Sequence, residues 1–148
     1  MTATLTRPAR ADRRATPLDG AFTVTPKLSA DGREMRITLS GLRSAPGDLV
    51  ITTRMLEGPE AGFDRALPAN HAALAALPFA IRQKQPMHVA GECCPVLLGH
   101  LEAVSQYWGV WLNIASATRI TADAIRPHSI YDPTRPHVLT LSGGVDSM

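Results

Sequence analysis

The most specific chemical motif in this sequence is a short run in which hydroxyl, glycine and carboxylate residues follow one another: Ser142, Gly143, Gly144, Val145, Asp146 and Ser147. Two adjacent glycines let the backbone turn tightly and approach an anion closely, because they have no Cβ. Peptide N–H groups in such a turn donate to phosphate oxygens, and a following helix N-terminus reinforces them. Ser142 and Ser147 can add hydroxyl donors, and Asp146 can hold a metal ion that bridges phosphates. The motif therefore predicts a polyphosphate site with a divalent cation.

The segment before this loop predicts the strand that such a site needs. Residues 137–141 read His-Val-Leu-Thr-Leu, a composition typical of a buried strand. Since glycine makes up about 7% of average sequences, five fixed positions match by chance in roughly one chain of this length in ten thousand. The alternative interpretation is a chance glycine turn.

This motif resembles the signature of the PP-loop ATP pyrophosphatases, the N-type family in the adenine nucleotide alpha hydrolase-like superfamily. That family includes asparagine synthetase, GMP synthetase, NAD synthetase and the tRNA-thiolation enzymes. A Walker loop is not indicated, because no lysine follows the glycines. The resemblance implies that Ser142, Gly143, Gly144 and Ser147 hold the pyrophosphate of ATP and that Asp146 binds Mg²⁺. It also implies that a substrate oxygen attacks the α-phosphate, after which ammonia, an amine or sulfur displaces AMP.

A looser resemblance extends upstream. Residues 86–111 combine a short strand, a Gly-Glu turn and a helix ending in tryptophans, and they look like the leader of certain uncharacterised bacterial PP-loop proteins. No substrate is implied by it. The helix expected after Ser147 and the later strands of the family do not follow, and a loop without its helix loses N–H donors and the helix dipole. We therefore expect an N-terminal fragment of an ATP-binding, AMP-forming enzyme, truncated or frameshifted and inactive by itself.

Alternating apolar residues predict the strands at the start of the chain. A hairpin is expected around the turn Asp31-Gly32, because apolar positions recur with period two on both sides of it. These positions are Phe22, Val24, Met35, Ile37 and Leu39. A third strand is predicted over residues 49–53, followed by a Gly- and Pro-rich loop over residues 57–68.

A helix rich in alanine and leucine is predicted over residues 69–77, and we expect Pro78 to end or bend it. Short strands are expected at residues 87–89 and 119–121, and a proline-broken connector at residues 127–136.

The strongest helix prediction covers residues 95–112, where Pro95 suits the first turn. Spacings of four and three residues place five apolar side chains on one face: Leu97, Leu101, Val104, Trp108 and Trp111. We expect this stripe, together with Tyr107, to pack in the core. A homodimer or interdomain contact through the stripe and a base-stacking platform are the alternatives.

These elements together predict an α+β fold, a small antiparallel sheet with two helices that leads into the first strand of an α/β domain. Residues 1–20 are expected to form a disordered basic tail, because they contain four arginines and few large apolar side chains. Residues 21–135 are the predicted N-terminal α+β domain. Residues 136–148 are the predicted first strand and phosphate loop of the ATP-pyrophosphatase domain.

Cysteines and histidines offer weaker signals. Cys93 and Cys94 precede a predicted helix start, where a helix dipole stabilises a thiolate, but buried packing is the favoured interpretation. The five histidines show no paired metal spacing on one helix. We expect them to be surface or hydrogen-bonded residues.

Composition narrows the classes of partner. The net charge of +2 is too small to indicate nucleic acid, and no apolar run approaches the roughly 20 residues that span a bilayer. With two adjacent cysteines there is no disulfide framework, which favours a reducing compartment and a cytoplasmic location. The alternative function is a non-enzymatic α+β interaction module that uses helix 95–112.

Overall fold

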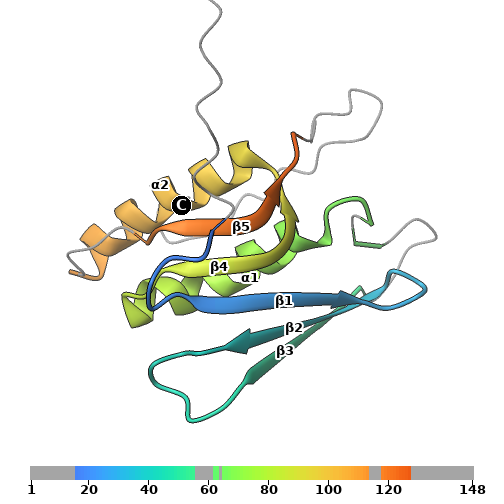
Figure 1. The fold of residues 1–148 in the computed structure, drawn as a ribbon, viewed down its shortest axis with the longest axis horizontal. Helices are drawn as coiled ribbons and strands as arrows, with labels where there is room; N and C mark the ends of the chain where they lie inside the picture. The colour runs from blue at the N-terminus through green and yellow to red at the C-terminus, as the bar shows by residue number, and fades with distance from the viewer. Residues whose placement is uncertain (1–15, 56–61, 64, 114–117, 128–148) are drawn as a thin grey trace, which may run out of the picture.

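A mixed sheet covered by two helices forms the described part of the chain (Figure 1). The computed structural model describes residues 16–55, 62–63, 65–113 and 118–127. The elements are β1 (Phe22–Leu28), β2 (Glu34–Ser40), β3 (Leu49–Arg54), α1 (Pro68–Gln83), β4 (Met87–Cys93), α2 (Pro95–Trp111) and β5 (Ile120–Ile125). The predicted α+β fold with a small sheet and two helices is confirmed, as are the hairpin, the third strand and the later short strands.

Strand order in the sheet is β3-β2-β1-β4-β5. Strands β1, β2 and β3 pair antiparallel, as predicted for the hairpin and the strand after it. Strands β4 and β5 add in parallel, β4 to β1 and β5 to β4, so the sheet is mixed rather than antiparallel throughout. The parallel pairing of β4 with β5 follows from α2, because a helical crossover between two strands returns the chain to the same end of the sheet.

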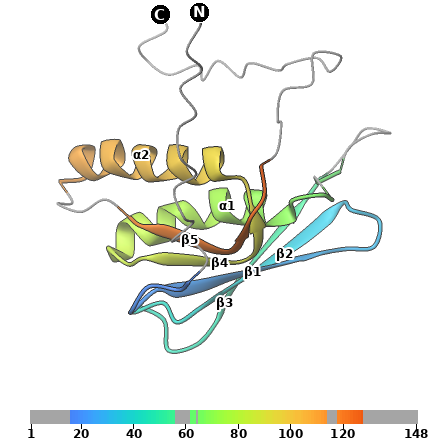
Figure 2. The same ribbon diagram turned by 45° about the horizontal axis from the view of Figure 1, so that its top comes forward.

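Both helices lie on one face of the sheet (Figure 2). Alternate residues of β1, β2, β4 and β5 point toward this face, and the fully buried ones form the core with the alanine-rich side of α1. The largest of them are Phe22, Val24, Met35, Ile37, Leu39, Met87, Val89 and Ile120. The intervening residues point to the opposite face, where Thr23, His88 and Thr121 are register neighbours on β1, β4 and β5.

Helix α1 is longer than predicted. It continues through Pro78 to Gln83, so of the two predicted effects of Pro78, ending or bending the helix, the first is wrong. Pro78 is exposed, whereas Leu77 and Ile81 on either side of it are buried against the core. Packing of this second half outweighs the backbone hydrogen bond that proline cannot make. The helix ends at Lys84, which has a left-handed backbone that closes the last turn.

Several predictions concern residues outside the described ranges. These are most of the basic tail, part of the loop after β3, most of the connector, the strand over residues 137–141 and the phosphate loop. Among the residues that the structure describes, no helix is long and apolar enough to cross a membrane.

Candidate functional site

The predicted ATP site lies in the part of the chain that the structure does not describe. This applies to Ser142, Gly143, Gly144, Asp146 and Ser147, and therefore also to the predicted Mg²⁺ ligand. Within the described ranges, no group of three or more His, Cys, Asp or Glu side chains is placed to hold a metal ion. The candidate site that the structure does describe is a surface on α2.

Helix α2 has two different apolar faces. Its buried residues are Leu98, Leu101, Ser105 and Gly109, which we call the core face. A second set lies on the exposed side, and we call it the aromatic face: Val104, Tyr107, Trp108 and Trp111. Val104 and Trp108 each precede a core-face residue by one position. One residue step is about 100° around a helix, so the two faces point in clearly different directions.

The aromatic face is exposed to solvent. The exposed fractions of Tyr107, Trp108 and Trp111 are 73%, 53% and 90%. The prediction that these rings pack in the core is therefore wrong. Of the predicted stripe, Leu101 is buried and Leu97 is partly buried, while Val104 and both tryptophans are exposed. Isolated exposed apolar residues are ordinary, whereas Tyr107, Trp108 and Trp111 are clustered on one helix.

Hydrogen bonds with the segment leading into β5 hold α2 in this orientation. The Ser105 hydroxyl accepts from the Thr118 backbone N–H at 3.0 Å and donates to the Glu102 carbonyl at 2.7 Å. A carboxylate oxygen of Glu102 accepts from the Ile120 N–H at 3.0 Å. Ser105 and Gly109, the two small residues of the core face, are both buried. Burying the tryptophans instead would break these hydrogen bonds.

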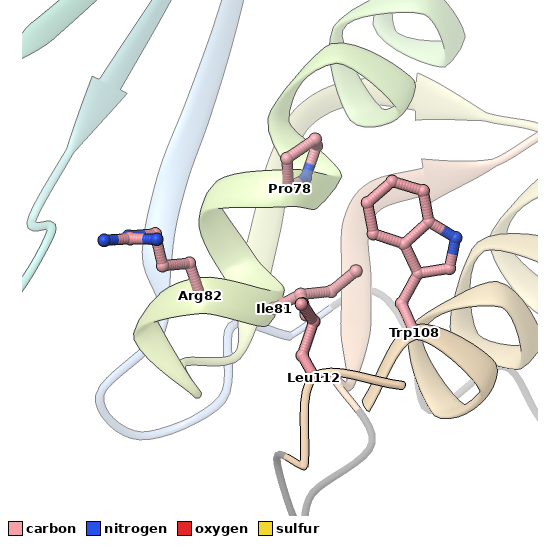
Figure 3. A pocket seen from close by; sticks show the side chains of 5 residues that line it. All are labelled: Pro78, Ile81, Arg82, Trp108 and Leu112. Carbon is pink, nitrogen blue, oxygen red and sulfur yellow. The ribbon is translucent and has the colours of Figure 1, made fainter. Parts of the chain in front are cut away.

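Next to the aromatic face is an apolar cavity of about 350 Å³ between the two helices. Pro78, Ile81 and Arg82 of α1 and Trp108 and Leu112 at the end of α2 line it. Figure 3 shows the indole of Trp108 facing Pro78 and Ile81, with the guanidinium of Arg82 directed away from Trp108. Four of the five lining residues are apolar and Arg82 is the charged one, so the cavity suits a largely hydrophobic side chain.

A second cluster joins β4 to β5 on the other face of the sheet. His88 is buried, its Nδ1 lies 2.8 Å from the Thr121 hydroxyl, and its Nε2 lies 2.9 Å from Asp123 Oδ1. The other oxygen of Asp123 accepts from the Gly91 N–H at 2.8 Å. These bonds hold the pKa of Asp123 below its usual value, the His88 bond being the largest cause. Thr121 is also buried, so the cluster has no accessible nucleophile and links two strands. His88 is thus a hydrogen-bonded histidine, as expected.

Both cysteines are buried, which supports the packing interpretation of Cys93 and Cys94. Burial raises the pKa of Cys93 to about 12, with smaller contributions from Cys94 and Asp123. The Cys94 N–H donates to the side-chain oxygen of Asn70 at 2.9 Å, which ties the start of α2 to α1. A thiol with so high a pKa is a poor nucleophile at neutral pH.

Comparison with known proteins adds no functional assignment, because no family profile and no curated protein matches this chain. Two features of the described site are absent from the sequence-based predictions. One is the orientation of α2, for which the small residues Ser105 and Gly109 were the available signal. The other is the pairing of His88 with Asp123, which lie 35 positions apart and have no shared local pattern.

Proposed function

We propose that residues 142–147 bind the pyrophosphate of ATP in an AMP-forming enzyme of the PP-loop type, with Mg²⁺ held by Asp146. The observation that carries this proposal is the succession of an apolar segment, a serine, two glycines and an aspartate followed by serine. Glycine backbone and hydroxyl groups are suited to oxyanions, and a carboxylate is suited to a hard divalent cation. On this proposal, residues 21–135 form a domain that precedes the nucleotide site. The adenylated substrate is a small molecule of undefined class, and the location is cytoplasmic.

The test is calorimetric titration of the chain with Mg·ATP, alongside the variants Asp146→Ala and Gly144→Val. We expect wild-type binding to be weak and both variants to reduce it at least tenfold, since each removes a cation ligand or blocks the close approach of the anion.

Two control variants match these substitutions outside the loop. Asp48→Ala removes an exposed carboxylate, and Gly47→Val adds a Cβ at a position where no atom lies within 4 Å of it. Both should bind Mg·ATP like the wild type. Equal affinity in all five proteins would remove the loop from the nucleotide site and refute the proposal.

The exposed aromatic face favours a second candidate, a non-enzymatic interaction module that uses α2. Three largely exposed aromatic rings on one helix are unusual unless another surface covers them. Under this candidate, deleting residues 142–148 leaves both the free energy of unfolding and the oligomeric state unchanged. A change in either property after the deletion would count against it.

A further inference from the structure

We propose that the aromatic face of α2 is the centre of a symmetric homodimer, in which Trp111 of each copy inserts into the cavity between α1 and α2 of the other. This inference is independent of the ATP proposal, because it uses only residues that the structure describes. It rests on the exposed apolar area, on the presence of both a protruding ring and a cavity on one surface, and on the absence of charged side chains from the aromatic face.

The area is appropriate for the centre of a dimer interface. A whole aromatic side chain has about 150–250 Å² of surface. At their exposed fractions, Tyr107, Trp108 and Trp111 together present roughly 300–550 Å² of accessible surface per copy. A standard interface buries about 800 Å² per partner, with an apolar centre and a polar rim. Val104 and Leu112 enlarge the same apolar surface, and both are substantially exposed. The rings therefore supply about half of what a stable dimer needs.

The surface is also self-complementary, which a two-fold interface requires because the same patch meets itself. Trp111 is the most exposed of the large hydrophobic residues that the structure describes, and it lies one helical turn beyond Trp108. Trp108 and Leu112 line the 350 Å³ cavity, which is large enough for an indole. A protruding ring and an apolar cavity thus lie side by side at one end of α2. A two-fold rotation can place each ring in the opposite cavity.

The charge distribution favours a second copy over a membrane surface. Within α2 the only Asp, Glu, Lys or Arg residue is Glu102, and it points toward β5, where it accepts the Ile120 N–H. Helices that bind anionic lipid carry Lys or Arg beside their apolar residues, and α2 has neither. The four side chains of the aromatic face carry no charge, so two copies of it approach each other without like-charge repulsion. Arg82 is the charged residue of the cavity lining, and its guanidinium is directed away from Trp108 (Figure 3).

The experiment is sedimentation of the full chain over a concentration series, with the substitutions Trp111→Lys and Val110→Lys. Val110 is the matched control because it is the adjacent residue, is 79% exposed and lies about 100° around α2 from Trp111. We expect the wild type to reach twice the mass of one chain. Trp111→Lys should raise the dimer Kd at least about 30-fold, as expected for loss of an aromatic hot spot. Val110→Lys should change the Kd less than about threefold.

Tryptophan fluorescence provides a second readout. The chain has two tryptophans, and both belong to the aromatic face, so the emission reports on this surface alone. We expect the emission to shift to shorter wavelength as the dimer forms, because the rings leave water. If circular dichroism shows that Trp111→Lys does not fold, Tyr107→Lys is the second variant, with the same expected loss of dimer.

A wild type that stays monomeric throughout the series would overturn the proposal, and the aromatic face would then serve a different partner. A dimer that both lysine variants weaken equally, or that neither weakens, would place the interface elsewhere. Open-ended association beyond two copies would exclude the two-fold arrangement.

Discussion

His88 Nε2 and Asp123 Oδ1 lie 2.9 Å apart, and this contact joins the parallel strands β4 and β5 on the sheet face opposite the helices. The imidazole is buried, whereas the Asp123 side chain is 58% exposed. The second oxygen of Asp123 accepts from the Gly91 N–H, at the irregularity in the register of the two strands. One carboxylate therefore satisfies both a buried ring nitrogen and the backbone of the bulge.

The first prediction is that Asp123→Asn lowers the free energy of unfolding at pH 7 by about 1 kcal/mol. This value is kept small because the Asp123 side chain is 58% exposed and solvent screens its charge. The single side-chain oxygen of asparagine can accept from His88 or from Gly91, whereas the two charged oxygens of aspartate accept from both. The pKa of Asp123 in the folded chain is below its ordinary value of 3.8. The stabilisation is thus complete above pH 3.8 and is lost as the pH falls through the folded pKa.

Urea denaturation of both proteins at neutral and acidic pH measures this difference. The difference in the free energy of unfolding between wild type and Asp123→Asn should become smaller below pH 3.8. Asp48→Asn, at an exposed loop position, is the control and should match the wild type within about 0.5 kcal/mol at neutral pH. If that difference stays constant or increases on acidification, the role of the His88–Asp123 bond is contradicted.

The second prediction is that Gly91→Ala destabilises the chain by about 1–3 kcal/mol. Gly91 has φ +119°, a conformation that residues with a Cβ rarely adopt, and the added Cβ would lie 3.3 Å from the Ala69 side chain on α1. Thermal unfolding followed by circular dichroism is the measurement. Gly47→Ala is the control, because a Cβ there meets no atom within 4 Å. Equal melting temperatures for the two variants would show that the bulge does not depend on glycine.

The third prediction is that neither cysteine reacts readily with a thiol reagent in the folded chain at pH 8. Cys93 and Cys94 are 0% and 1% exposed. Raising the pKa of Cys93 from 9.0 to about 12 lowers its thiolate population by roughly 1,000-fold. Reaction with a chromogenic thiol reagent, followed by absorbance, should detect two thiols in denaturant and almost none in the folded chain. A cysteine introduced by Asp48→Cys should react at once, and native Cys93 or Cys94 reacting at the same rate would contradict the burial.

Local patterns predicted most of the elements correctly. Alternation from Phe22 to Leu39 predicted the β1–β2 hairpin because a strand with one buried face must repeat every two residues. Pro95 predicted the start of α2 because proline loses no intrahelical bond in the first turn. These features depend on neighbours within a few positions, which are present in the sequence itself.

Other features depended on residues that meet only in the folded chain. Pro78 lies inside α1 because packing of Leu77 and Ile81 outweighs one lost backbone bond. The buried side of α2 contains Ser105 and Gly109 rather than the tryptophans. The hydrogen bonds of Ser105 with Thr118 and of Glu102 with Ile120 fix this orientation.

The amino-acid sequence by itself determined the strands, the helix starts and the glycine-rich motif of residues 142–147, because each is encoded in adjacent side chains. Tertiary structure alone decided that Trp108 and Trp111 face solvent and that His88 meets Asp123. Periodicity shows that a helix has an apolar side, but the shape of its neighbour selects which side is buried. A hydrogen bond between parallel strands depends on a register that no local pattern contains.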